Sequence, residues 1–585
     1  MTKRQKENSF RLRLFVFTLV IALFFVAAVG RIIYLQIVHG EAYSEAIKGQ
    51  IGTSEDREIQ SLRGTIYDRN GQVLAQSEHV YNVIIDPKVL QDASPVDQQY
   101  TIKELTDILR IKDDALLTKY LDPSYKNSRY ELFSAGRGVS ESVNALIEQR
   151  ISEGVIKGVW MEEIQERRYP EKELAAHVIG FNEAYGLEYY YNEELSGTSG
   201  RRMTVQMSDG TYSTQVVEAI NGKNLITTLD RTVQYYLETA LADVMQEQNC
   251  RRAWGILMNP KTGEIYAMAG YPTFDLNDVE NVIGLTSKYK PEEVRAESFL
   301  PALWNNPVVS ETYEPGSTFK PVFASAALDC GAISEYDTFE CGAVYHYYDI
   351  EFKCAFYTAH GLETIRDIIQ NSCNVGMIQV SEQITTEEYC AYQDAFGIGR
   401  RTGIDLPGEA SAKTLVYDKY SMGPVERATA SFGQGFNLTP IQLITAVSAC
   451  VNNGYLVQPR VVSGITDAEG NLLEDKPVQI ARQVISQETS SIIRDGMEAV
   501  VESEPGIWGE LEGYHIGGKT GTAEKDYEDK RYVVSFVGFA PIEDPEVGLL
   551  IVLDEADEGT SAVAQRVAAK VFKKTLPYMN LYPED

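Results

Sequence analysis

One short stretch of the sequence holds a serine and a lysine at a spacing that suits acyl-transfer chemistry. Ser317 and Lys320 lie three residues apart in the sequence EPGSTFK (314–320), and an apolar run follows that predicts a buried helix starting there. Residues three apart share one face of a helix. A serine hydroxyl is a weak nucleophile that needs an adjacent base, and a lysine can be that base where burial lowers its pKa. We therefore interpret Ser317 as a candidate nucleophile and Lys320 as its base.

A second Ser-x-x-Lys sequence shows that the spacing alone is not sufficient. Ser287 and Lys290 have the same separation, but they lie in a polar segment that Pro291 ends. No apolar helix follows that would bury the lysine, and a solvated lysine keeps its proton at neutral pH. We assign no catalytic role to this copy.

Two further polar triplets follow Ser317 along the chain. Ser372 and Asn374, after a helical stretch, would present one hydroxyl and one amide to a cleft, and Lys519 begins the sequence KTGT (519–522). Each triplet has a second copy elsewhere, at 142–144 and at 261–263, so neither is specific by itself. The order is specific: Ser-x-x-Lys, Ser-x-Asn 55 residues later (372 − 317), and Lys-Thr-Gly a further 147 residues on (519 − 372).

The elements expected around these residues indicate an α+β catalytic domain. A helix is expected to start at Asp230, which has the residue type of an N-cap, and a last helix is expected at 561–575. Strand-like runs are found at 225–229, 253–259, 264–269, 533–539 and 547–553. Strands at both ends with helices between them predict one antiparallel sheet flanked by helices.

The first forty residues predict a membrane anchor. Five basic residues precede an uncharged apolar run of 17 residues (30 − 14 + 1), and a second apolar run follows Arg31. Seventeen residues are about the minimum for a spanning helix, whereas a cleaved signal peptide, the alternative, usually has an apolar core of roughly 7–15 residues. Basic residues on the N-terminal side keep that end in the cytoplasm. The rest of the chain is therefore expected outside the cytoplasm, at the cell membrane.

The length of 585 residues exceeds what one hydrophobic core supports. The sequence texture changes near residue 218, from a Tyr- and Gly-rich stretch to alternating strands and helices. We expect a multidomain chain: a cytoplasmic tail at 1–13, a transmembrane anchor at 14–38, an elongated non-catalytic domain at 39–217 and the catalytic domain at 218–585.

The composition and the absence of other motifs narrow the function. Acidic residues outnumber basic ones 84 to 53, for a formal charge of −31, which argues against a nucleic-acid partner. The sequence holds no Gly-x-Ser-x-Gly and no His-Glu-x-x-His motif. Its six histidines are scattered without metal-ligand spacing, so we predict no metal site and no cofactor.

The seven cysteines are an odd number, so at least one is unpaired. Cys341 and Cys354 flank an aromatic and β-branched segment with a central Tyr-Asp, which predicts a hairpin whose ends meet. A disulfide between them, favoured in an extracytoplasmic domain, and two separate thiols both fit the sequence.

The ordered triplets resemble those of the penicillin-recognising serine acyltransferases. The sequence RGTIYDRNG (63–71) resembles the first signature of the class B penicillin-binding proteins. Further pieces resemble their non-catalytic pedestal, which is dimerisation-like, and their catalytic domain: RYP (168–170), AHVIGF (176–181), GLE (186–188), LSG (195–197), FGQG (432–435) and TPIQ (439–442). The resemblance spans nearly the whole chain.

This resemblance implies a peptidoglycan D,D-transpeptidase that β-lactams inhibit covalently. Ser317 would attack the carbonyl between the last two D-alanines of a stem peptide, and Lys320 would take its proton. Ser372 is implied as a proton relay, Asn374 as a residue that holds the substrate amide and orients Lys320, and Lys519 as a source of positive charge. The residues implied in substrate binding are Thr520, Gly521 and Thr522.

The implied partners are peptidoglycan stem peptides, β-lactams, the cell membrane and a polytopic membrane glycan polymerase. Two alternatives use the same triplets: a D,D-carboxypeptidase and a catalytically idle scaffold of a cell-wall synthesis complex. The anchor and the large first domain favour transfer, because a lone hydrolase needs neither. The sequence leaves open a role in division, elongation or sporulation, the acceptor amine, the β-lactam affinity and the oligomeric state.

Overall fold

The computed structural model describes residues 55–132, 135–181, 183–206, 212–282, 289–354, 357–526 and 531–584. The expected cytoplasmic tail and transmembrane anchor, residues 1–38, lie outside these ranges, and so does Ser287 of the second Ser-x-x-Lys copy. None of the helices in the described ranges combines the length and the apolar character needed to cross a membrane.

The chain divides into two compact units, residues 1–61 with 198–221, and residues 62–197 with 222–585. In the first unit, the described residues form an antiparallel sheet in the order β1-β6-β7. Its strands are β1 (Glu55–Ile59), β6 (Gly200–Gln206) and β7 (Tyr212–Val217).

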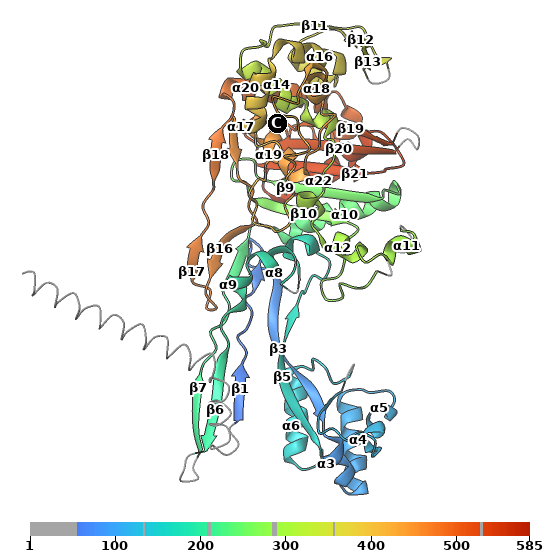
Figure 1. Ribbon diagram of the computed structural model, residues 1–585, viewed down its shortest axis with the longest axis vertical. Coiled ribbons are helices and arrows are strands. Elements are labelled where there is room, and N and C mark those ends of the chain that lie inside the picture. Colours follow the sequence, from blue (N-terminus) through green and yellow to red (C-terminus); the bar gives the residue numbers. More distant parts are fainter. Residues whose placement is uncertain are drawn as a thin grey trace, which may run out of the picture. The chain divides into compact units, whose positions relative to one another are not determined.

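The second unit contains the sheet predicted for the catalytic domain. Its five strands have the order β10-β9-β21-β20-β19, and every neighbouring pair is antiparallel (Figure 1). The prediction of one antiparallel sheet built from both ends of the domain is therefore confirmed. The strands are β9 (Arg252–Met258), β10 (Ile265–Tyr271), β19 (Gly517–Asp526), β20 (Arg531–Ala540) and β21 (Val547–Asp554).

Helices pack on both faces of this sheet. On one face, α10 (Arg231–Glu247) and α22 (Ala562–Tyr578) bury a core with the strands. The predicted cap at Asp230 is present, since its side chain accepts from two backbone N–H groups of the first turn of α10. The other face carries a larger core with the helices of the site, α14 (Lys320–Asp329), α19 (Pro440–Val451) and α20 (Gln487–Glu502).

A second sheet joins segments far apart in the sequence, in the order β17-β16-β8-β2-β3-β4, with β5 also paired to β3. A turn at 70–71 joins β2 to the antiparallel β3, and Gly71 has a φ of +78° there. The strands are β2 (Ile66–Tyr67), β3 (Val73–Ile85), β4 (Tyr130–Glu131), β5 (Val159–Arg168), β8 (Asn224–Thr227), β16 (Val462–Thr466) and β17 (Leu472–Asp475).

Four helices form a separate apolar core with β3 and β5. They are α3 (Pro87–Asp92), α4 (Pro95–Ile108), α5 (Ala115–Thr118) and α6 (Glu141–Ser152). The shorter elements between Ala176 and Leu511 that do not line the site are α7 (Ala176–Ile179), α8 (Gly186–Tyr190), α9 (Asn192–Ser196), α11 (Pro291–Val294), α12 (Phe299–Trp304), α13 (Pro307–Ser310), α17 (Thr386–Ala395), β15 (Tyr455–Val457), β18 (Ile480–Gln483) and α21 (Pro505–Trp508).

A buried ion cluster joins three segments of the chain: the residues just before β2, the strand β5 and the helix α8. Glu188 of α8 is 1% exposed and accepts from two arginine side chains, Arg63 Nε at 2.6 Å and Arg167 Nε at 2.7 Å. Arg63 also donates to the backbone carbonyl of Glu188 at 2.6 Å. Two cations thus share one buried carboxylate, with each of its oxygens paired.

Candidate active site

Ser317 lies on a tight turn at the start of a buried helix. Residues Gly316–Phe319 form a 3-10 turn, and α14 continues directly from Lys320. The sequence analysis expected an ordinary helix over these residues. Ser317 instead lies within the 3-10 turn, and Lys320 is its C-cap and the first residue of α14. Ser317 is half-buried, whereas Lys320 is fully buried.

A glycine from a distant segment fixes the position of this turn. Gly316 donates its backbone N–H to the carbonyl of Gly433 at 2.9 Å. A Cβ at Gly433 would lie 1.9 Å from the carbonyl oxygen of Gly316, and Gly433 has a φ of +82°. Only glycine fits both conditions. Sequence reasoning noted this residue within FGQG (432–435), which follows α18 (Pro424–Ser431), but gave it no role.

Lys320 is held by three acceptors from one loop. Its Nζ donates to the Ser372 carbonyl at 2.5 Å, to Ser372 Oγ at 3.2 Å and to Asn374 Oδ1 at 2.8 Å. Burial lowers the pKa of Lys320 to about 8. With this pKa, a minor fraction of the lysine is neutral near neutral pH, and the neutral form is what a general base requires.

The loop that meets Lys320 has a constrained backbone. Ser372 follows α15 (Ile365–Gln370) and has a φ of +55°, a left-handed conformation that costs a non-glycine residue of order 1–3 kcal/mol. Asn374 is the first residue of α16 (Asn374–Gln383), and its Nδ2 donates to the carbonyl of Lys353 at 3.2 Å. The loop and its neighbour at Lys353 thus orient the hydroxyl and the amide together.

The third triplet lies on the edge strand β19, alongside the serine turn. Lys519 is fully buried, and its Nζ donates to Thr520 Oγ1 at 3.1 Å. Burial and the nearby charge of Lys320 lower the pKa of Lys519 well below its usual range. A Cβ at Gly521 would lie 2.9 Å from Thr318 Cγ2, so the absence of a side chain lets β19 approach the turn. Thr522, next along the strand, is exposed.

The three triplets therefore meet in one place. The Lys320 ammonium contacts the Ser372 loop, and the turn that carries Ser317 packs against β19. Neither Lys320 nor Lys519 forms an ion pair with a carboxylate within the described part of the chain. The arrangement brings a serine hydroxyl together with two buried lysines.

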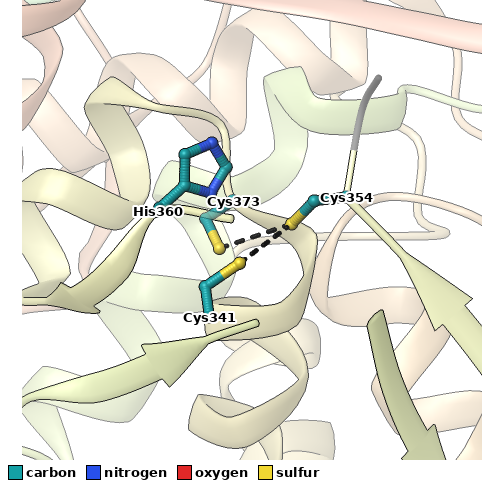
Figure 2. A group of neighbouring side chains, drawn as sticks. All are labelled: Cys341, Cys354, His360 and Cys373. Atoms are coloured by element: carbon teal, nitrogen blue, oxygen red, sulfur yellow. Dashed lines mark hydrogen bonds between the residues drawn. The ribbon is translucent and has the colours of Figure 1, made fainter. Parts of the chain in front are cut away.

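Four residues outside the predicted catalytic set lie close together (Figure 2). The predicted hairpin is present as β12 (Val344–Tyr347) and β13 (Ile350–Lys353), and the sulfurs of Cys341 and Cys354 at its ends lie 3.5 Å apart as free thiols. Cys373 and His360 complete the group. The sequence analysis predicted no metal site because the histidines are scattered along the chain. The available signal was the combined pattern Cys-x12-Cys-x5-His-x12-Cys over residues 341–373.

Comparison with known protein families gives two matches. Residues 254–576 match the penicillin-binding protein transpeptidase domain. Residues 58–183 match the penicillin-binding protein dimerisation domain.

Similar proteins and structures extend these matches along the chain. Stage V sporulation protein D of Bacillus subtilis is 32% identical, over 94% of this chain and 83% of its own length. Peptidoglycan D,D-transpeptidase FtsI of Escherichia coli K12 is 26% identical, over 100% of this chain and 95% of its own length. Penicillin-binding protein 2X from Streptococcus thermophilus has the same fold, with a TM-score of 0.73 and 24% identity, covering 89% of this chain and 80% of that one.

The fold and the site define a penicillin-binding enzyme of the serine acyltransferase type. The chain belongs to the class B penicillin-binding proteins, with a dimerisation and a transpeptidase domain in a multidomain α+β architecture. It is a serine-type peptidoglycan D,D-transpeptidase that binds β-lactams.

Proposed function

We propose that Ser317 is the nucleophile of this transpeptidase and that Lys320 is its general base. The observation that carries the proposal is the Lys320 ammonium: it is fully buried, meets only neutral acceptors and follows the serine by one 3-10 turn. Neutral Lys320 takes the proton of the Ser317 hydroxyl as Oγ attacks the carbonyl between the last two D-alanines of a stem peptide. The carbon–nitrogen bond then breaks, and the leaving D-alanine amine receives a proton from Lys320 through Ser372.

An acyl-enzyme results, with the penultimate D-alanine joined to Ser317 Oγ as an ester. An amine of a neighbouring stem peptide attacks this ester, its proton passes to the enzyme base, and Oγ leaves with a proton restored. The product is a peptide cross-link. A β-lactam follows the first half of this path, because opening of its ring also forms an ester on Oγ.

We assign the remaining groups by their chemistry. Asn374 holds the substrate amide and orients Lys320 through its Oδ1. The backbone N–H groups of Ser317 and Thr522 form the oxyanion hole, where one donor is worth about 2.7–4 kcal/mol. The residues that receive the terminal carboxylate near Lys519 are Thr520, Gly521 and Thr522. The carboxylate supplies the negative charge that the buried cations lack.

The peptide itself binds by strand addition to β19. Within the described residues this strand pairs on one side only, with β20. An extended peptide can therefore satisfy its backbone groups against the free edge, as in other strand-addition complexes.

Transfer, and not hydrolysis or idle binding, is the function that the whole chain supports. The long segment before the catalytic domain favours it, and we place the boundaries at 1–13 for a cytoplasmic tail, 14–38 for the anchor, 39–217 for the pedestal and 218–585 for the transpeptidase domain. The catalytic domain then lies outside the cytoplasm at the membrane, where a polytopic glycan polymerase is the expected partner.

The nucleophile is tested by labelling the purified chain with a fluorescent penicillin. We expect covalent label on the wild type and on Ser287→Ala, the serine of the second Ser-x-x-Lys copy, but none on Ser317→Ala. Label that survives Ser317→Ala would disprove the assignment. Turnover of a stem peptide with and without an acceptor amine then separates transfer from hydrolysis.

The anchor is tested separately, by co-purification from membranes. The chain with residues 1–40 is expected to recover a glycan polymerase, and the chain without them is expected to recover much less. Equal recovery would count against the anchor as the contact.

A further inference from the structure

Four side chains behind the active-site loop form a compact set of metal-binding donors. Cys341 ends β11 (Phe339–Cys341), Cys354 follows β13, His360 precedes β14 (Gly361–Glu363), and Cys373 precedes α16. Their ligand atoms all lie within 4.8 Å of one another. Three sulfurs and one ring nitrogen converge on a common centre (Figure 2).

The distances and the donor types match a tetrahedral site. Cys354 Sγ lies 3.5 Å from both Cys341 Sγ and Cys373 Sγ. Two thiolates on one tetrahedral Zn²⁺, each about 2.3 Å from the metal, are separated by roughly 3.8 Å. Three cysteines and one histidine are a donor set of closed, structural zinc sites. Soft thiolate ligands in tetrahedral geometry favour zinc over the hard cations, which prefer oxygen.

Two buried polar atoms beside the sulfurs have no hydrogen-bond partner among the described residues. They are His360 Nδ1 and one carboxylate oxygen, Oε2, of Glu363. The two atoms lie 3.7 Å apart, and Glu363 is 1% exposed. An unpartnered buried polar atom is costly, so its presence here points to a missing partner. A cation between the thiols and the imidazole would supply that partner.

The backbone around the cluster is arranged for anionic sulfur. The N–H of Gly376 donates to Cys373 Sγ at 3.2 Å, and the N–H of Val375 donates to Cys354 Sγ at 3.5 Å. Both donors belong to the first turn of α16, where the helix dipole favours negative charge. Metal binding requires thiolates, and these contacts stabilise them.

We propose that Cys341, Cys354, His360 and Cys373 bind one structural Zn²⁺. The ion joins the β11–β14 segment to the start of α16, and so it fixes the loop that presents Ser372 and Asn374 to Lys320. Cys373 stands between these two residues in the sequence. The active-site loop also contacts the cysteine segment directly. Asn374 donates to the backbone carbonyl of Lys353, the residue before Cys354.

A disulfide is the competing use of these thiols. Any single disulfide among the three cysteines leaves the third sulfur and the His360 nitrogen outside the bond. One tetrahedral ion engages all four donors at once. The donor set therefore favours the metal over the disulfide.

The first test is the metal content of the full-length chain, purified in detergent without chelator. We expect about one zinc per chain by elemental analysis, and loss of more than half of it in Cys341→Ser and in His360→Ala. The matched controls are Cys330→Ser, a half-buried thiol elsewhere, and His346→Ala, an exposed histidine on the adjacent hairpin. Both controls should retain the full zinc content.

Replacement by cobalt tests the coordination without any mutation. The chain freed of zinc by a chelator and loaded with Co²⁺ should show the thiolate-to-cobalt charge-transfer and visible bands of a tetrahedral site. A thiol count in denaturant without reductant separates the alternatives: seven reactive thiols for the zinc site, and five (7 − 2) for one disulfide. Five thiols, a chain that takes up no zinc when reduced, or stoichiometric binding of a different metal would each overturn the proposal.

The positioning role has its own readout. Chelation should lower the rate of penicillin labelling at least tenfold, and equimolar Zn²⁺ should restore it; an unchanged rate would overturn this role. Ser317→Ala should bind a full equivalent of zinc although it takes no label. A failure of the metal site and a failure of the proposed nucleophile are thus distinguishable.

Discussion

Two buried cation clusters in the same unit are balanced in opposite ways. At Glu188, two arginines share one carboxylate, and both of its oxygens are paired. At the active site, Lys320 and Lys519 are both fully buried, and their described partners are a serine, an asparagine, a threonine and backbone carbonyls. The chain supplies the first cluster with a buried carboxylate, whereas no carboxylate among the described residues pairs with either lysine of the second.

This difference indicates a structural role for the arginine cluster and a functional role for the lysine pair. A buried charge is tolerated when it is paired and hydrogen-bonded, and the arginine cluster meets that condition while joining Arg63, β5 and α8. The lysine pair violates it, and such violations concentrate at functional sites. Under the proposed function, the carboxylate of a terminal D-alanine would supply an anion at this site.

The largest effect is expected when the buried Lys320 is replaced. We expect Lys320→Met to lower the rate of penicillin labelling by about 10²–10⁴, because general-base catalysis contributes roughly that much. Its melting temperature should stay the same or rise, since an unpaired buried cation is removed. A labelling time course and a thermal melt measure the two effects.

Lys353→Met is the matched control. This residue contacts Asn374 through its backbone carbonyl only, so the substitution should leave labelling unchanged. A Lys320→Met protein that labels as fast as the control would refute the base assignment.

Removing the shared carboxylate of Glu188 should lower stability and leave the labelling rate nearly unchanged, the reverse of the effect of Lys320→Met. Glu188→Gln leaves two arginines buried around a neutral amide, which is expected to cost about 3–5 kcal/mol of stability. Labelling per folded molecule should be close to that of the wild type, because no residue of the three triplets contacts Glu188. Denaturant unfolding and active-site titration measure the two quantities, and a stable Glu188→Gln protein would contradict the structural role.

The pH dependence of labelling sharpens the contrast further. Lys320 must be neutral to accept a proton, and burial lowers its pKa to about 8. The neutral fraction rises with pH below that value, so the acylation rate should increase roughly tenfold per pH unit and level off above about pH 8. A stopped-flow rate profile measures this, and a flat profile from about pH 6 to pH 8 would rule out Lys320 as the titrating base.

The smallest effect is expected at the rim of the arginine cluster. Glu183 also pairs with Arg63, at 3.4 Å, but its side chain is 57% exposed. Exposed pairs are worth about 0–1 kcal/mol, so Glu183→Gln should lower the free energy of unfolding by less than about 1 kcal/mol. A loss as large as that of Glu188→Gln would mean that burial does not distinguish the two carboxylates.

Much of the catalytic fold follows from local pattern. The strands β8, β9, β10, β20 and β21, the capped start of α10, the last helix and the Cys341–Cys354 hairpin all lie where residue type and periodicity predicted them. These elements are regular and apolar, so their own residues specify them.

The features that sequence reasoning missed are tertiary. Gly433 acts through a contact with Gly316, more than a hundred residues earlier in the sequence. No pattern in the residues around Gly433 predicts this contact. His360 joins three cysteines only because the ends of three strands and the start of one helix converge on one point. The triplets themselves were recognisable by their order, but the 3-10 turn and the left-handed backbone of Ser372 were not.

The open edge of β19 has a consequence beyond catalysis. Unpaired strand edges template the association of other chains, and proteins commonly protect them with proline, bulges or covering segments. Residues 517–522 of this strand have no proline and include three glycines, and a peptide-binding edge cannot be covered permanently. Under the proposed binding mode, the backbone groups of β19 that would recognise a stem peptide are therefore also a site for self-association of the chain. A bound peptide or β-lactam should make the concentrated enzyme more resistant to aggregation.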